Sequence, residues 1–128
     1  MRNITILVAD DNHVFRKTLC EFVESLGAVT VVAEALDGDH AIELTSKLLP
    51  DMILMDISMP NKTGLEAAKA IKTRYPGIFV VVITLHDGAV YRQLAKECLA
   101  DDFIPKSDMK NKLSALIMHR LHSGEYET

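Results

Sequence analysis

The chain has 128 residues, a length that fits one domain and allows folding to bury roughly two thirds of the unfolded surface. Hydrophobic residues make up 48% and charged residues 25%, which excludes a collagen, a coiled coil, a disulfide miniprotein and a disordered segment. Lys and Arg number 14 against 18 Asp and Glu, so the formal charge is -4 and no basic run is present. We therefore do not expect this chain by itself to bind DNA.

The cysteines and the longest apolar run bear on the cellular compartment. Cys20 and Cys98 stand far apart without a Cys-x-x-Cys motif, which indicates reduced thiols rather than a zinc or redox site. The apolar run Ile78–Leu85 is broken only by Thr84 and is far shorter than the ~20 residues that span a bilayer. The N-terminus lacks the apolar stretch of a signal peptide. We predict a cytoplasmic protein that makes no use of a membrane.

Short apolar runs alternate with helical patterns along the chain. Such runs are typical of buried parallel strands when helices follow them. The predicted strands are Ile4–Ala9, Val29–Ala35, Met52–Asp56, Ile78–Thr84 and Phe103–Pro105.

Five helices are predicted between and after these strands, each from apolar residues at helical spacing. Gly27 ends the first helix, the Asp37-Gly38 turn precedes the second, Pro50 ends that helix, and Asp87 is a candidate cap of the fourth. The third helix is expected over about 65–75. The first helix has the apolar residues Phe15, Leu19, Phe22, Val23 and Leu26, and the second has Ala41, Leu44 and Leu48. The fourth has Tyr91, Leu94 and Cys98, and the fifth has Leu113, Leu116, Ile117 and Leu121.

This alternation predicts a doubly wound α/β domain, in which right-handed crossovers build a five-stranded parallel sheet covered by five helices. Pro105 cannot donate a hydrogen bond to a neighbouring strand, so its strand should lie at an edge. The flavodoxin-like strand order 2-1-3-4-5 places it there. We expect the domain to span residues 1–123 and residues 124–128 to form a tail or the start of a linker.

Polar side chains follow the predicted strands at one end of the sheet. Asp10 and Asp11 follow the first strand, Asp56 and Thr84 end the third and fourth, and Lys106 follows the fifth. Ligands of such sheets bind beyond the carboxyl ends of the strands, where the strand order reverses. Three carboxylates gathered there repel one another and raise each other's pKa unless a cation neutralises them. With oxygen ligands and no Cys or His at ligand spacing, the ion should be Mg²⁺, or alternatively Mn²⁺.

A phosphorylation site is the simplest interpretation of this set, because Mg²⁺ usually shares its protein carboxylates with a phosphate oxygen. Asp56 is then the candidate nucleophile that forms an aspartyl phosphate. Lys106 supplies a compact positive charge to the phosphoryl oxygens, and Thr84 a hydrogen bond. Asp11, with Asp10 acting directly or through water, holds the metal. Each residue alone is commonly a turn, cap or surface residue, and only their combination favours this function.

The sequence resembles the receiver domain of two-component response regulators over nearly its whole length, and most closely the NarL-type branch, which is also called the LuxR type. Members of that branch usually carry a DNA-binding helix-turn-helix domain after the receiver. The segments that carry the resemblance are Ile6–Asn12, Glu34–Gly38, Pro50–Pro60, Gly64–Ala67 and Phe103–Lys106.

The resemblance implies that Asp56 accepts a phosphoryl group from a sensor histidine kinase or a phosphotransfer protein. Asp10 and Asp11 match the acidic pair that helps to bind Mg²⁺, and the backbone carbonyl of Ser58 matches the third protein ligand. Lys106 matches the conserved lysine position of the family.

The resemblance also implies a switch. Thr84 matches the hydroxyl position, and Phe103 matches the aromatic residue that turns inward when the hydroxyl moves toward the phosphate. Family members commonly have Gly where this chain has Leu99 and Asp102, so we expect the end of the fourth helix to be shortened or redirected. Output is expected through the fourth helix, the fifth strand and the fifth helix, with homodimerisation as a further expected interaction.

Two alternatives remain open from the sequence. The chain is either a receiver cut from a regulator with a DNA-binding output domain or a stand-alone phosphorelay receiver. A haloacid-dehalogenase-like phosphatase also uses an Asp nucleophile with Mg²⁺, but it needs a second Asp two residues later, where this chain has Ser58.

Overall fold

The computed structural model describes residues 3–85 and 88–123. Strands and helices alternate in the order β1 (Ile4–Ala9), α1 (His13–Ser25), β2 (Val29–Ala35), α2 (Gly38–Leu48), β3 (Met52–Asp56), α3 (Gly64–Arg74), β4 (Phe79–Thr84), α4 (Ala89–Glu97), β5 (Asp102–Pro105) and α5 (Met109–Ser123). A short 3₁₀ helix, η1 (Lys106–Asp108), joins β5 to α5. The strands form a parallel sheet in the order β2-β1-β3-β4-β5, so the predicted fold class and strand order are confirmed.

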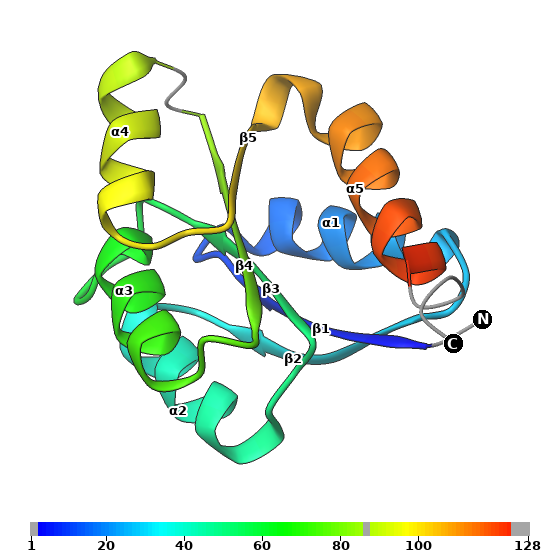
Figure 1. The fold of residues 1–128 in the computed structure, drawn as a ribbon, viewed down its shortest axis with the longest axis horizontal. Helices are drawn as coiled ribbons and strands as arrows, with labels where there is room; N and C mark the ends of the chain where they lie inside the picture. The colour runs from blue at the N-terminus through cyan, green and yellow to red at the C-terminus, as the bar shows by residue number, and fades with distance from the viewer. Residues whose placement is uncertain (1–2, 86–87, 124–128) are drawn as a thin grey trace.

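Helices cover both faces of the sheet (Figure 1): α1 and α5 pack on one side, and α2, α3 and α4 on the other. The alternation of side chains along β3 serves both faces, because Met52 and Leu54 join the cluster under α1 and α5 while Ile53 and Met55 join the cluster under α2 and α3. All four are fully buried. A strand that is apolar on both sides is therefore the sequence signature of the sheet centre.

The strand register brings the predicted polar residues to one edge. Ala9 pairs with Met55, which sets Asp10 beside Asp56 at the carboxyl ends of β1 and β3. Thr84 pairs with Pro105 on the outermost strand, as expected for a residue without a backbone N–H. Residues that are distant in sequence thus converge because parallel strands end together.

Side-chain caps fix the starts of the helices that leave this edge. Asn12 accepts a hydrogen bond from the backbone N–H of Phe15 and begins α1, and Asp37 does the same for α2 by accepting from His40. Thr63 and Glu66 form a reciprocal capping box at α3. Each of these three helices therefore begins at a residue whose side chain accepts a hydrogen bond from a backbone N–H of the first turn.

Two helices differ from the sequence prediction in their inner faces. Leu48 is 46% exposed rather than buried, and Thr45 takes its place on the inner face of α2, because the helix ends at Leu48 and Leu49 turns the chain away with a left-handed backbone. In α4 the buried residue is Ala95, whereas Leu94 is 37% exposed. The predicted cap of α4, Asp87, lies outside the described residues.

The end of α4 follows the expectation in part. Leu99 has a φ of 68°, the left-handed conformation that Gly adopts most easily, so the helix stops at Glu97 and the chain turns into β5. Asp102 is a strand residue paired with Val81 and has no left-handed backbone. The departure from Gly at Asp102 therefore imposes no strain there.

In the part of the chain that the structure describes, no helix combines the length and apolar character needed to cross a bilayer.

Gly64 fixes the β3–α3 loop because backbone lies directly against it. Its N–H donates to the carbonyl of Ile57 over 3.0 Å, and a β-carbon at Gly64 would collide with the carbonyl oxygen of Asp56. Any side chain at Gly64 must therefore displace the loop that follows Asp56.

We predict that Gly64→Ala lowers the free energy of unfolding by about 1–3 kcal/mol, the typical cost of overpacking against atoms that cannot move away. Gly77→Ala is the matched control, because nothing lies within 4 Å of a β-carbon at Gly77, and it should change stability by less than about 0.5 kcal/mol. Urea unfolding of the three proteins measures both values. Equal stability of the two variants would contradict the close approach at Gly64.

Candidate functional site

Three carboxylates meet at the carboxyl edge of the sheet. Oxygens of Asp10, Asp11 and Asp56 lie within 4.8 Å of one another. Asp10 is 1% exposed and Asp56 8% exposed, whereas Asp11 faces solvent. The structure therefore brings together the acidic residues that the strand ends predicted.

Lys106 is the cation in contact with this cluster. Its Nζ lies 3.0 Å from Oδ2 of Asp10 and 3.8 Å from Oδ2 of Asp56, and its side chain is only 10% exposed. The ammonium also lies 3.9 Å from the centre of the Phe15 ring on α1. Lys106 thus reaches from the end of β5 across to β1, β3 and α1.

Burial and the neighbouring charges together raise the pKa of Asp56 to about 6. Burial away from water is the largest cause, and the negative charges of Asp10 and Asp11 act in the same direction. The positive charge of Lys106 and a backbone hydrogen bond from Ile57 oppose the rise without cancelling it. The charged form of Asp56 is therefore costly in this structure without a further cation.

Asp10 is held by hydrogen bonds on both its side chain and its backbone. The N–H of Asn12 donates to Oδ1 of Asp10 over 2.8 Å, and Arg16 donates to the backbone carbonyl of Asp10 over the same distance. Arg16 is 8% exposed and also pairs with Glu34 on β2 at 2.8 Å. This guanidinium ties α1, β2 and the loop of Asp10 together.

The sequence prediction missed Arg16 and the contact of Phe15. Arg16 stands three and four residues before Leu19 and Cys20, on the buried side of α1, and a charged residue on an apolar stripe is the signal that could have found it. The apolar stripe of α1 predicts only a core position for Phe15. The ring does pack on the core, and it also contacts Lys106.

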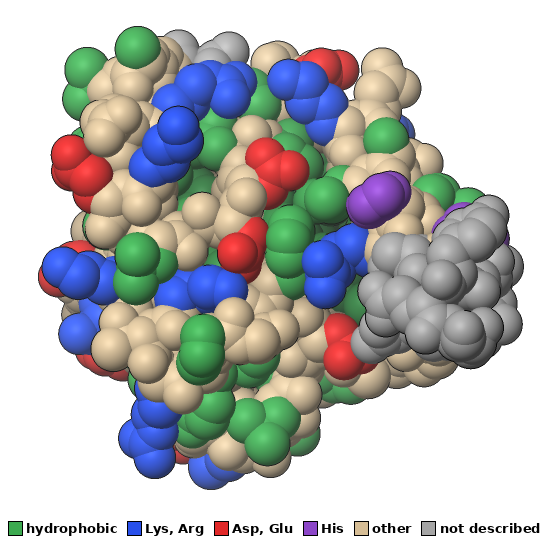
Figure 2. Space-filling view, in the orientation of Figure 1, with side chains coloured by type: hydrophobic (Ala, Val, Ile, Leu, Met, Phe, Trp, Pro, Cys, Tyr) green, Lys and Arg blue, Asp and Glu red, His purple; other side chains and the backbone are tan. Residues whose placement is uncertain are grey.

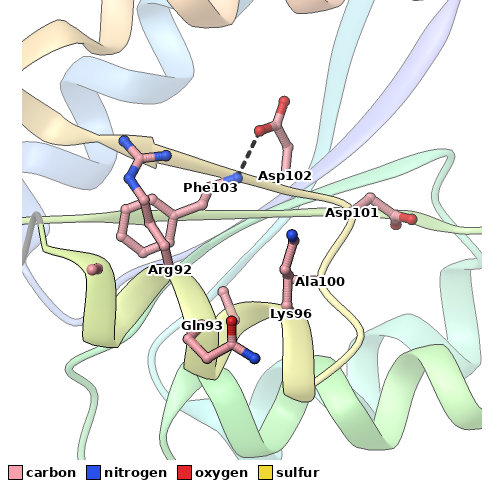
Figure 3. A pocket seen from close by; sticks show the side chains of 9 residues that line it. Arg92, Gln93, Lys96, Ala100, Asp101, Asp102 and Phe103 are labelled. Atoms are coloured by element: carbon pink, nitrogen blue, oxygen red, sulfur yellow. Dashed lines mark hydrogen bonds between the residues drawn. The ribbon is translucent and has the colours of Figure 1, made fainter.

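The remaining predicted residues lie on β4, on β5 and in the loop after β3. Thr84 is fully buried at the end of β4, and Ser58 is exposed in the loop after β3. Phe103 is 8% exposed and packs with Ile57 and Ala95 on the α4 side of the sheet. Figure 3 shows the Arg92 side chain over this ring, with the guanidinium carbon 4.8 Å from the ring centre.

A groove of about 400 Å³ runs between α4 and β5 beside Phe103, lined by side chains such as Arg92, Lys96 and Asp101 (Figure 3). On the face that Figure 2 shows, acidic and basic side chains are interspersed rather than grouped by sign. This face therefore shows no large patch of one sign of charge.

The donor set fits a hard divalent cation. The three clustered residues offer carboxylate oxygens only, and Mg²⁺ and Mn²⁺ prefer oxygen ligands. A divalent ion also removes the excess negative charge that raises the pKa of Asp56. The cluster can therefore hold a metal ion.

The comparison with protein families agrees with this geometry. Residues 6–118 match the family model described as the response regulator receiver domain. The chain belongs to this family. Receiver domains bind Mg²⁺ at an acidic pocket, and the cluster of Asp10, Asp11 and Asp56 could bind a metal ion.

Similar proteins include regulators and enzymes that are much longer than this receiver. The transcriptional regulatory protein DegU of Brevibacillus brevis is 40% identical over 88 residues, which cover 69% of this chain and 37% of DegU. A protein-glutamate methylesterase/protein-glutamine glutaminase of Pyrococcus horikoshii is 40% identical over 106 residues, which cover 82% of this chain and 29% of the enzyme. The receiver thus spans well under half of these curated relatives.

Among solved structures, the signal receiver domain of the response regulator NarL from Mycobacterium tuberculosis superposes with a TM-score of 0.86. It is 29% identical, and the match covers 92% of this chain and 95% of that domain. The NarL structure and the DegU match are consistent with the NarL/LuxR-type branch of receivers.

We predict that ionisation of Asp56 lowers the stability of this receiver as the pH rises from 3.8 to about 6. Between its ordinary pKa of 3.8 and the raised pKa of about 6, the folded protein holds a proton that the unfolded chain has lost, so stability falls as the pH rises through this window. Asp56→Asn should therefore be more stable than the wild type at pH 8 in metal-free buffer, by on the order of 1 kcal/mol after discounting for solvent screening. The difference should shrink toward pH 4.

Urea unfolding at pH 4, 6 and 8 with a chelator present measures this difference, and Glu21→Gln on the exposed side of α1 is the control that should keep the wild-type pH profile. If the difference in the free energy of unfolding between Asp56→Asn and the wild type grew as the pH fell, the predicted direction of the pH dependence would be wrong.

Proposed function

We propose that this receiver is a phosphoryl-accepting signalling switch, in which Asp56 takes a phosphoryl group from a sensor histidine kinase or a phosphotransfer protein in a Mg²⁺-dependent reaction. The observation that supports this function best is the buried contact between Lys106, Asp10 and Asp56 at the carboxyl edge of the sheet. A buried carboxylate that lies beside an ammonium and beside two further carboxylates able to hold a metal ion is suited to receiving a phosphoryl group, which needs cationic partners.

In the proposed reaction an oxygen of Asp56 attacks the phosphorus atom of the donor. The new carboxylate–phosphorus bond forms while the bond to the donor's leaving group breaks, and the leaving group departs with the bonding electron pair. Lys106 is positioned to contact the phosphoryl oxygens, because its Nζ is 3.8 Å from Oδ2 of Asp56. Burial of Asp56 favours the transfer by removing water that would compete for the carboxylate.

Mg²⁺, or alternatively Mn²⁺, is the proposed cofactor, held by Asp10, Asp11, Asp56 and the backbone carbonyl of Ser58. The bound ion supplies electrostatic stabilisation of the transferring phosphoryl group. The clustering of the three carboxylates within 4.8 Å supports this ligand set.

Thr84 and Phe103 are the proposed switch residues. Thr84 ends the strand next to β3, so a small movement of its hydroxyl can follow a phosphoryl group on Asp56. Phe103 links β5 to α4 through its packing and through Arg92. A phosphoryl group that contacts Thr84 differently in two states would shift their populations and change the surface of α4, β5 and α5.

The proposed output is a DNA-binding domain that this sequence does not contain. The support is that the match covers only 37% of the DegU sequence, whose name describes a transcriptional regulatory protein. A stand-alone phosphorelay receiver is the alternative. Homodimerisation of the receiver is also proposed, whereas direct DNA binding by this chain is not.

We predict that phosphoryl uptake requires Asp56 and depends strongly on Lys106. Incubation with Mg²⁺ and acetyl phosphate should add one alkali-labile phosphoryl group, seen by intact-protein mass spectrometry. Asp56→Asn should abolish the adduct, and Lys106→Ala should slow its formation on the order of a hundredfold, because the cation that meets the phosphoryl oxygens is lost. Asp39→Asn on the exposed surface of α2 is the control and should react as the wild type does.

Two results would contradict this function. An adduct that persists in Asp56→Asn would place the reaction elsewhere. Repeated turnover of a phosphomonoester without an adduct would favour the phosphatase alternative.

We predict that Mg²⁺ reverses the stability order of the wild type and Asp11→Asn. Without metal, the variant should be at least as stable as the wild type, because it removes one of the charges that repel Asp56. With Mg²⁺ at about ten times its dissociation constant, the wild type should gain about 1.4 kcal/mol and a few degrees in Tm, and Asp11→Asn should gain much less. Thermal unfolding with and without chelator measures this, and equal gains in both proteins would exclude Asp11 as a ligand.

A further inference from the structure

The ring of Phe15 forms one wall of the Lys106 position. The ammonium stands 3.9 Å from the ring centre, closer than the other lysine that faces a ring on α1, which is Lys110 at 5.9 Å from Phe22. The Lys106 side chain is only 10% exposed, so water screens this contact weakly. Phe15 is half-buried and packs on the core cluster under α1 and α5, which fixes the ring in place.

The other contacts of the ammonium are the two buried carboxylates. Oδ2 of Asp10 lies at 3.0 Å and Oδ2 of Asp56 at 3.8 Å, so the ammonium is nearer to Asp10. A lysine has a flexible four-carbon stem, so two ion pairs on one side do not by themselves fix the position of its ammonium between the two oxygens. The ring face attracts the ammonium from a third point, which belongs to a different element.

We propose that Phe15 is a positioning residue whose ring holds the Lys106 ammonium between Asp10 and Asp56, within reach of a group that arrives on Asp56. Core packing holds the Phe15 ring in one position. The cation–π contact with this ring then restricts where the ammonium of the flexible Lys106 side chain can lie. The effect of Phe15 on phosphoryl uptake rests on the function proposed above, whereas its effect on the Lys106 position does not.

The first test measures the position of Lys106 by NMR without any phosphoryl donor. Protons above the face of an aromatic ring are shifted upfield, so the ε-methylene protons of Lys106 should resonate upfield of the other lysines and should show an NOE to the Phe15 ring. Phe15→Tyr keeps the ring and should keep both signals, whereas Phe15→Leu should lose both. Phe22→Leu is the matched control on the same helix and should leave both signals of Lys106 unchanged.

The second test measures the rate of phosphoryl uptake from acetyl phosphate with Mg²⁺. Phe15→Leu should slow uptake by about threefold to tenfold, the rate equivalent of losing a partly desolvated cation–π contact, whereas Phe15→Tyr and Phe22→Leu should react at the wild-type rate. Replacing Phe15 with phenylalanines of increasing ring fluorination weakens the negative ring face while nearly keeping its shape. The rate should therefore fall stepwise with fluorination, which a purely structural role of the ring would not produce.

The outcomes separate the two proposals. If the wild type takes up no phosphoryl group, the proposed function fails, and the NMR signals still decide whether Phe15 positions Lys106. If the wild type reacts but Phe15→Leu reacts equally fast, or if fluorination leaves the rate unchanged, the positioning role is overturned while the proposed function stands. A missing upfield shift in the wild type also overturns it. Circular dichroism confirms that each variant is folded before it is compared.

Discussion

The burial of Asp56 beside Asp10 and Asp11, only partly offset by Lys106, is the constraint on which this end of the molecule depends. The buried position of Asp56 makes its charged form costly, and the two neighbouring carboxylates add to that cost. A fold tolerates such an arrangement only where the rest of the structure is stable enough to hold like charges together. The cost of burying these charges and the proposed chemistry therefore have one origin, because the same carboxylates could bind a divalent cation and Lys106 is the proposed partner of the phosphoryl group.

The sheet and its loops hold these charges in place. The parallel register sets Asp10 beside Asp56, and full burial of both faces of β3 leaves that strand no freedom to shift. Around this core, Arg16 binds the backbone of Asp10 and the close approach at Gly64 fixes the chain after Asp56. Phe15 adds a contact to the one side chain in the cluster that is long and flexible. Rigid backbone thus positions the carboxylates, and a ring positions the ammonium.

Most of this architecture follows from local patterns in the sequence. The predicted bounds of β1, β2 and β3 agree with the structure. For β1 and β3 the reason is that a buried apolar run has a sharp end where the polar residues Asp10 and Asp56 are reached. The convergence of Asp10, Asp56 and Lys106 also follows, since parallel strands end at one edge. The exposure of Leu48 and Leu94 was not predicted. Helical spacing shows which side of a helix is apolar, but it does not show how far the sheet beneath the helix extends. The ion pair of Arg16 with Glu34 and the contact of the Phe15 ring with Lys106 join different elements. The spacing of residues along one helix gives no information on such distances.

The most direct test of the proposed phosphoryl and metal site is a crystal structure of the protein with Mg²⁺ and trifluoroberyllate, which bonds to a carboxylate oxygen as a phosphoryl group does. We expect beryllium bonded to Asp56 and the metal between that residue and the pair Asp10 and Asp11. We also expect the Lys106 ammonium to have moved from Asp10 to a fluoride. Beryllium on another residue, or a metal bound away from the three carboxylates, would contradict the proposed site.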